Sequence, residues 1–299
     1  MFILHIDSGN EMRGGQWQAL YLMRGLAALG HRIRLLAPES SPLRKLAIDD
    51  GIDARPLRAA ALASATSGVE LIHAHDARAH TLAVLGGKPA VVSRRVAFPV
   101  RRGVGSRWKY ARAAHYIAVS HCVKQTLLDA GVPSEKITVV YDGVVIDAQP
   151  PQKEGRSDVV ALDSDDPGKC KAMVEQAAAL ARIPIRFSKN LPEDLQTAAV
   201  FVYITELEGL GSAALLAMAS GAAVLASRVG GLVEIVEDGR TGLLTNNDPP
   251  SIAQGITRLL NDPAFARRLS AAARVRVEKE FTVEHMVNQT VQVYERMLS

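Results

Sequence analysis

Cysteine, aromatic residues and long apolar runs are all scarce in this sequence. Its 299 residues include only two cysteines, Cys122 and Cys170, and 5% aromatic residues. Two widely spaced cysteines fit neither a disulfide framework nor a metal-ligand motif, and they favour a reducing compartment. No stretch approaches the roughly 18 uninterrupted apolar residues of a membrane span. The start, MFILHIDSGN, has no basic region, so we expect no signal peptide and a cytoplasmic protein.

Acidic residues are missing from one long segment. The net charge of +4 divides into +7 over residues 1–147 and −3 over residues 148–299. Between Asp76 and Asp129 there is no acid at all, while lysine and arginine recur throughout. A surface of this charge attracts phosphates, anionic lipid or nucleic acid.

The basic segment also contains Phe98, Trp108 and Tyr110. No recognised nucleic-acid-binding motif accompanies them, so we expect no nucleic-acid partner. We expect instead a surface that docks on the inner face of the cell membrane or on a phosphorylated acceptor, with a solvated loop as the simpler alternative. The residues expected to form this surface are Arg94, Arg95, Arg101, Arg102, Arg107 and Lys109.

Short apolar runs alternate with helical patterns along the whole chain, which predicts βαβ units and parallel sheets. Hydrophobic residues make up 48% of the sequence, enough for a large core. The polar segment 148–158 is the best linker. We therefore predict an α/β protein with two Rossmann-like, doubly wound domains. Expected strands are 2–6, 32–38, 69–76, 90–95, 116–120, 136–144, 159–163, 183–189, 200–205, 222–228 and 241–245; expected helices are 16–29, 42–50, 121–130, 169–181, 192–198, 212–219, 232–237, 250–261, 263–280 and 283–299.

Three glycine-containing loops join a predicted strand to a predicted helix. They hold Gly14-Gly15, the segment Glu208-Gly209-Leu210-Gly211, and Gly230-Gly231 followed by Glu234. Glycines let the backbone approach a ligand, and helix N-termini favour anions. Each loop alone could be a turn or a helix cap. Two such loops in one domain favour an anionic ligand.

His73 and His75 come at the end of a predicted strand, where α/β sheets bind ligands. Residues two apart share a face of a strand. A metal pair is conceivable, but no third ligand stands out. Contact with a sugar or phosphate, or a buried structural role, are the other interpretations.

Four segments, in this order and at this spacing, resemble GT-B glycosyltransferases, specifically glycosyltransferase family 4. The segments are RGGQWQALYLMRGLAALGH (13–31), IHAHD (72–76), YIAVSHCVKQTLLDAGVPSEKITVVYDGVVID (116–147) and EGLGSAALLAMASGAAVLASRVGGLVEIVEDGRTGLL (208–244).

The resemblance implies two Rossmann-like domains that face a cleft. An acceptor-side domain would span 1–147, a nucleotide-sugar domain 159–282, and the last helix, 283–299, would cross back to the first domain. Family members retain anomeric configuration and need no metal for catalysis, so no cofactor is expected. By position, His75 would contact the transferred sugar, with His73 the other choice, and Glu208 would bind sugar hydroxyls. Donor contacts would come from Gly14, Gly15, Lys169, Gly209, Leu210, Gly211, Gly230, Gly231 and Glu234.

The sequence departs from the family pattern in its C-terminal half. The family has a second glutamate eight positions after the first, for the ribose, where this chain has Leu216. An arginine expected near the diphosphate is absent from VVALDSDDPGKCK (159–171), and Lys169 or Lys171 would supply the lysine. Acids in the same segment would repel a diphosphate. The segment 158–200 is also short, so we expect a shortened C-terminal domain.

The resemblance thus implies a retaining glycosyltransferase. It would move a sugar from a nucleotide-sugar donor to a cell-envelope glycan or lipid-linked acceptor. The alternative is a catalytically degenerate family member that binds a glycan or scaffolds another protein. Donor binding distinguishes the two hypotheses, because transfer requires it.

Overall fold

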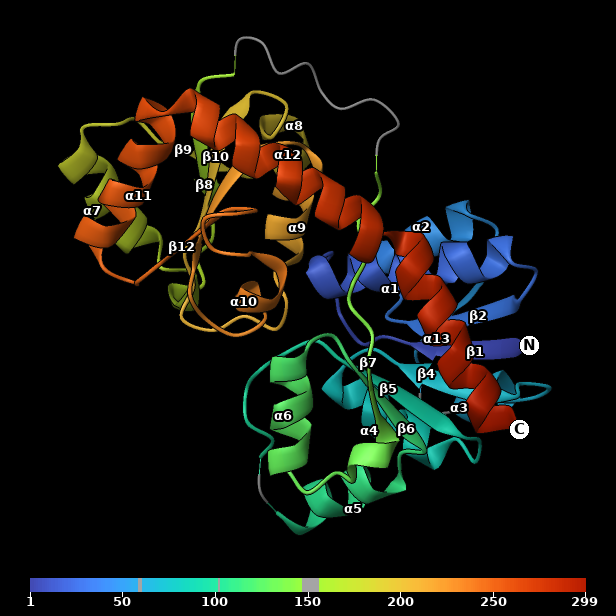
Figure 1. The fold of residues 1–299 in the computed structure, drawn as a ribbon. Helices are drawn as coiled ribbons and strands as arrows, with labels where there is room; N and C mark the ends of the chain where they lie inside the picture. The colour runs from blue at the N-terminus through green and yellow to red at the C-terminus, as the bar shows by residue number, and fades with distance from the viewer. Residues whose placement is uncertain (59–60, 102, 147–155) are drawn as a thin grey trace. The chain divides into compact units, whose positions relative to one another are not determined.

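Two separate parallel sheets, each covered by helices, make up the protein. In this computed structural model residues 1–58, 61–101, 103–146 and 156–299 are described. Unit 1 comprises Met1–Gly143 together with Val283–Ser299, and unit 2 comprises Val144–Thr282 (Figure 1). Most of the predicted linker, 148–158, lies outside the described residues.

Unit 1 is built on a seven-stranded sheet with the order β3-β2-β1-β4-β5-β6-β7. All neighbouring strands in it pair in parallel. The order reverses between β1 and β4, and the carboxyl end of such a switch point is where doubly wound sheets bind ligands. The strands are β1 (Phe2–Ile6), β2 (Arg32–Ala37), β3 (Asp53–Pro56), β4 (Leu71–Ala74), β5 (Ala90–Arg94), β6 (His115–Ala118) and β7 (Ile137–Val139).

Helices on both faces bury this sheet. The face that carries Ile3 and Leu71 packs against α1, α2 and the C-terminal helix α13. Helices α1 and α13 approach closely, because a Cβ added to Gly25 of α1 would lie 2.4 Å from Val287 Cγ2. Asp76 caps α4 through its side chain. The helices are α1 (Gly14–Ala28), α2 (Pro42–Asp49), α3 (Ala61–Ala65), α4 (Ala77–Leu85), α5 (Val104–Arg112), α6 (His121–Asp129) and α13 (Val283–Leu298), with a 3₁₀ turn at Ser134–Lys136.

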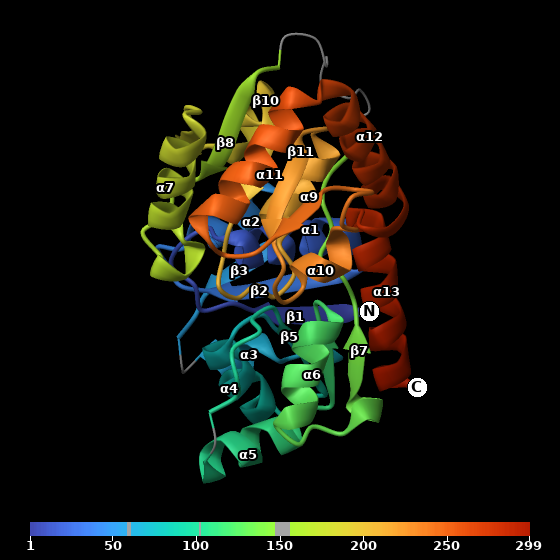
Figure 2. The same ribbon diagram turned by 60° about the vertical axis from the view of Figure 1, so that its left-hand side comes forward.

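Unit 2 is built on a five-stranded parallel sheet with the order β12-β11-β10-β8-β9. Its switch point lies between β8 and β10. One face packs against α7 and α11, and α9 packs against α12 on the other (Figure 2). The elements are β8 (Asp158–Leu162), α7 (Lys171–Ala181), β9 (Arg186–Ser188), α8 (Leu191–Asp194), β10 (Ala198–Tyr203), α9 (Ser212–Ala219), β11 (Ala223–Ser227), α10 (Leu232–Ile235), β12 (Leu243–Thr245), α11 (Pro249–Asn261) and α12 (Pro263–Glu280), with a 3₁₀ turn at Pro167–Lys169.

The structure differs from the expected elements at several points. The basic segment, for which a solvated loop was the simpler alternative, forms helix α5 over Val104–Arg112. The helix predicted over 169–181 is interrupted, because Cys170 adopts a left-handed conformation with φ of 49° between the 3₁₀ turn and α7. The helix predicted over 192–198 ends at Asp194, since Ala198 already belongs to β10.

Candidate active site

Lys169 and Glu208 meet at the switch point of unit 2. Lys169 ends the 3₁₀ turn that follows β8, and Glu208 lies in the loop that follows β10. The Lys169 Nζ atom is 2.7 Å from Glu208 Oε2. Both side chains are only partly exposed, 24% for Lys169 and 16% for Glu208. Two residues 39 positions apart are therefore joined where this type of sheet binds ligands.

Hydrogen bonds to one main-chain carbonyl hold the two loops together. The carbonyl oxygen of Gly168 accepts from the Thr205 hydroxyl at 2.9 Å and from the Glu206 N–H at 2.9 Å. The position of Lys169 beside Glu208 thus depends on the folded backbone, not only on the attraction of the two charges.

Lys171, the other lysine that the sequence left open, pairs with a different carboxylate. Its Nζ atom lies 2.5 Å from Asp163 Oδ1, and Lys189 lies 3.6 Å from the other oxygen. The hydrogen bond from Lys171 lowers the pKa of the Asp163 carboxyl. Asp166 accepts a hydrogen bond from the Gly168 N–H at 3.0 Å. Two of the acids expected to repel a diphosphate therefore have partners, and Lys169 is the lysine that lies beside Glu208.

Tyr203 is a member of this site that the sequence analysis missed. Its hydroxyl donates to Glu208 Oε2 and accepts from Lys169 Nζ at 2.8 Å. Burial, with the Glu208 carboxylate as the second cause, raises the pKa of Tyr203 well above its usual value. The available signal was a tyrosine at the end of an otherwise apolar strand, five positions before the glutamate.

The predicted glycines support the Glu208 loop. The Gly231 N–H donates to the Glu208 carbonyl at 3.0 Å. A Cβ added to Gly230, whose φ is +50°, would lie 2.1 Å from that oxygen, and one on Gly231 would lie 2.2 Å from the Gly209 carbonyl. Gly211 precedes α9 with φ of +108°. The other predicted donor residues here are Leu210, which is buried, and Glu234, which is half-buried in α10.

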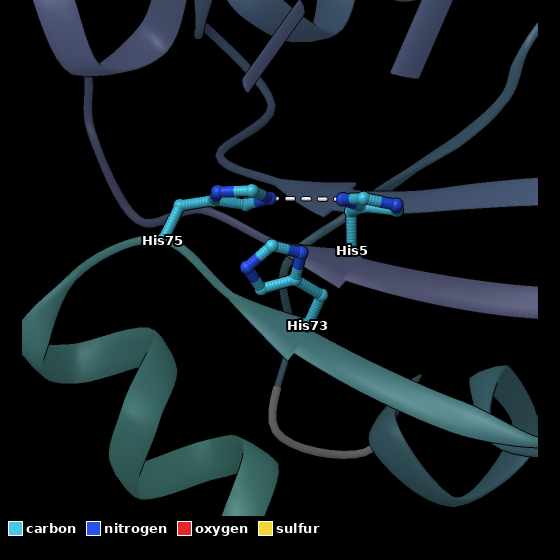
Figure 3. A group of neighbouring side chains, drawn as sticks. All are labelled: His5, His73 and His75. Atoms are coloured by element: carbon cyan, nitrogen blue, oxygen red, sulfur yellow. Dashed lines mark hydrogen bonds between the residues drawn. The ribbon is translucent and has the colours of Figure 1, made fainter. Parts of the chain in front are cut away.

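The switch point of unit 1 holds three buried imidazoles. His5 of β1 pairs in register with His73 of β4, and His75 follows that strand (Figure 3). The nitrogens His5 Nδ1 and His75 Nε2 are 2.9 Å apart. The third imidazole beside His73 and His75 is thus His5. The sequence did not reveal it, because it is a polar residue inside the apolar run FILHI.

These imidazoles form a hydrogen-bonded array. His73 Nδ1 lies 2.5 Å from the Tyr294 hydroxyl of α13, and its Nε2 lies 2.8 Å from Ser93 Oγ. Two nitrogens on one zinc ion would be about 3.3 Å apart, given Zn–N bonds of about 2.0–2.1 Å. The spacing of His5 and His75 is shorter and is that of a hydrogen bond. Burial lowers the pKa of His5 to about 3 and lowers those of His73 and His75 well below their usual value.

Arg95 belongs to this array and not to the exposed basic surface predicted for it. Its side chain is 11% exposed and forms a salt bridge of 3.0 Å with Asp142. Its Nη1 atom is 3.3 Å from His75 Nδ1, and its Cδ would be 3.7 Å from a Cβ on Gly15. Gly14 and Gly15 begin α1, so the predicted glycine loop and His75 lie near the same arginine.

The other predicted surface residues divide between internal and exposed positions. Arg94 donates to the Tyr110 hydroxyl at 2.9 Å and to the Phe98 carbonyl, and Lys109 donates to the Ala77 carbonyl at 3.1 Å. The bonds made by Tyr110 and Lys109 fasten α5 to β5 and to α4. Arg101 and Arg107 are exposed. Arg102 lies outside the described residues.

The contact with Arg95 determines which ring nitrogen of His75 carries the proton, and NMR spectroscopy can test this. An arginine only donates, so Nδ1 of His75 must accept and the neutral ring carries its proton on Nε2. We expect ¹H–¹⁵N NMR to find this tautomer at pH 7, and we expect the ring to take up its second proton only below the ordinary range of an imidazole, because burial lowers the pKa of His75. Arg95→Leu should mix the two tautomers, whereas Arg107→Leu, at an exposed position, should not. A proton on Nδ1 in the unmodified protein would contradict the assignment.

Comparison with known proteins identifies the family. Residues 12–148 match the model described as Glycosyltransferase Family 4, and residues 159–262 match that described as Glycosyl transferases group 1. The chain belongs to glycosyltransferase family 4. Its two parallel sheets, each covered by helices, give it the GT-B fold.

Curated relatives of this family 4 protein match it over part of their length. An alpha-maltose-1-phosphate synthase of Mycolicibacterium smegmatis is 40% identical over 115 residues, which are 36% of this chain and 30% of the relative. An N-acetyl-alpha-D-glucosaminyl L-malate synthase of Bacillus anthracis is 32% identical over 106 residues, 35% of this chain and 28% of the relative. The matches thus span less than a third of these relatives.

Solved structures match the family 4 chain over its full length. The Anabaena protein HepE in complex with UDP-glucose has a TM-score of 0.86 at 16% identity, covering 99% of this chain and 100% of HepE. A sucrose-phosphate synthase of Thermosynechococcus elongatus has a TM-score of 0.74 at 20% identity, covering 99% and 98%. In the described part of this chain, no helix combines the length and the apolar character of a membrane span.

Proposed function

We propose that the protein is a retaining glycosyltransferase that uses a nucleotide-sugar donor, held by unit 2. The observation that carries this proposal is the Lys169–Glu208 pair of 2.7 Å at the β8/β10 switch point. A lysine there neutralises diphosphate charge, and a carboxylate accepts hydrogen bonds from sugar hydroxyls. The UDP-glucose bound to HepE supports the same donor class.

The same residues suggest how bond cleavage would be assisted. Negative charge develops on the departing nucleoside diphosphate, and fixed positive groups stabilise it most when they are already in place. Lys169 and the N–H groups at the start of α9, after Gly211, would supply this stabilisation. We propose that no metal is needed for the step, because lysine and backbone dipoles take the electrostatic role.

Calorimetric titration tests the proposal. UDP, UDP-glucose, GDP, ADP and CMP are titrated into the protein with EDTA and then with magnesium. We expect saturable binding of one nucleotide family, with equal affinity in both buffers. Absence of binding by folded protein would refute the donor site. It would favour the second candidate, a degenerate glycan-binding or scaffolding protein, which Leu216 supports because a leucine cannot accept hydrogen bonds from ribose.

We propose further that α5 forms the surface facing an acceptor or an anionic membrane at the inner face of the cell membrane. It carries exposed Arg107, and the apolar side chains of Phe98, Val104 and Trp108 are 61%, 87% and 41% exposed nearby. Basic and apolar side chains together are typical of interfacial helices. A cell-envelope glycan or lipid-linked molecule would be the acceptor at such a surface.

Vesicle sedimentation tests this surface. We expect the protein to bind vesicles that contain phosphatidylglycerol and to remain in solution with pure phosphatidylcholine. Val104→Asp and Arg107→Glu together should lower binding at least fivefold. Equal binding by this variant, or no binding by the unmodified protein, would remove α5 as a membrane surface and leave an acceptor surface as its role.

A further inference from the structure

The hydroxyl of Tyr203 lies between the two charged groups of the proposed donor site. It is hydrogen bonded to Glu208 Oε2 and lies 2.8 Å from Lys169 Nζ, while these two atoms are 2.7 Å from each other. We propose that Tyr203 is a positioning residue, which fixes Lys169 and Glu208 as one rigid donor-recognition unit. This inference rests on the proposed function and deepens it.

Counting hydrogen bonds shows what the unit can offer a ligand. Of the three N–H groups of Lys169, one is used by Tyr203 and one by Glu208, within the described residues. On Glu208, Oε2 accepts from both partners and Oε1 accepts from the Gly209 N–H at 3.0 Å. A lysine has three donors and a carboxylate about four acceptor positions. One ammonium N–H and one carboxylate lone pair therefore remain, which suit a phosphate oxygen and a sugar hydroxyl.

The position of Tyr203 makes it a firm support. It is the last residue of β10, between β8 and β11 in the sheet, and only 5% of its surface is exposed. Lysine and glutamate side chains otherwise lose much conformational freedom when a ligand orders them. A hydroxyl that holds both in advance reduces that cost, which is the general advantage of a preorganised site.

The position of Tyr203 also suits a donor site that lacks the second carboxylate and the arginine of the family pattern. Leu216 stands where a second carboxylate would hold the ribose, and the loop after β8 has no arginine. Fewer charged groups are left to recognise the donor, so the orientation of the remaining two matters more. Tyr203 orients both of them with one atom.

Tyr203→Phe is the direct test, since it removes the hydroxyl and keeps the ring. We expect the affinity for UDP-glucose, measured by calorimetry, to fall about tenfold and that for UDP about threefold. Tyr116→Phe is the matched control. Tyr116 is a buried tyrosine of unit 1 whose hydroxyl donates to the Tyr110 carbonyl at 2.9 Å. This variant should lose a similar amount of thermal stability and keep both affinities within twofold.

Unchanged affinities in Tyr203→Phe, with a loss of stability like that of the control, would overturn the proposal and leave a structural hydroxyl. A second measurement does not depend on any nucleotide. The rate of reductive methylation of Lys169, followed by mass spectrometry, should rise at least fivefold in Tyr203→Phe, because the ammonium loses one of its two anchors. An unchanged rate would refute positioning even if the unmodified protein binds no nucleotide, whereas failure to bind any nucleotide would refute the proposed function alone.

Discussion

Replacing Glu208 with glutamine should abolish the preference for a sugar-bearing nucleotide. Glutamine keeps the size of the side chain but removes the charge that faces Lys169 and would accept from sugar hydroxyls. Loss of a charged hydrogen bond in a preorganised site costs about 10²–10³ in rate. We expect turnover of the nucleotide sugar that binds in the calorimetric titration to fall at least 100-fold and its affinity about tenfold.

The affinity for UDP alone should hold or increase in Glu208→Gln. The substitution removes a negative charge beside the proposed diphosphate site and leaves Lys169 without its counter-ion. Calorimetry with UDP and UDP-glucose measures both effects in one experiment. Glu206→Gln is the matched control, because Glu206 lies two positions earlier and is exposed. A UDP-glucose affinity in Glu208→Gln equal to that of the unmodified protein would remove Glu208 from the site.

Mild acid should destabilise unit 1. Burial lowers the pKa of His5 and of His80 to about 3 and that of His115 to about 4. Between pH 6.5 and these values the unfolded chain binds more protons than the folded one, so the free energy of unfolding falls as the pH falls. For His5 alone the linkage amounts to about 2 kcal/mol between pH 7.5 and pH 5. Asp7 acts in the opposite direction, because burial raises its pKa.

Tryptophan fluorescence can follow this effect selectively. The two tryptophans of the chain, Trp17 and Trp108, both lie in unit 1. We expect the urea midpoint of their fluorescence change to fall steadily from pH 7.5 to pH 5. His5→Asn should reduce this slope, because asparagine does not titrate. His121→Asn, at an exposed position, should preserve it. A midpoint independent of pH over this range would contradict neutral buried imidazoles.

Local sequence was a good guide wherever one segment acts alone. The apolar run FILHI forms β1. The side chain of Ser120 caps α6, and serine is a residue that commonly caps helices. The basic segment between Asp76 and Asp129 was harder to predict, because its helix α5 buries none of its residues and so has no apolar periodicity. The sequence could not tell which of its basic residues turn inward.

The sequence by itself determined the alternation of strands and helices, the glycine loops and the two GT-B halves, because these depend on patterns within one short segment. Only the tertiary structure decided which side chains meet. Parallel pairing places His5 beside His73, and it brings Lys169, and not Lys171, to Glu208 and Tyr203. It also turned Arg95 inward to Asp142. In a parallel sheet the neighbours of a strand are distant in sequence, so residues that form one site leave no common local signal.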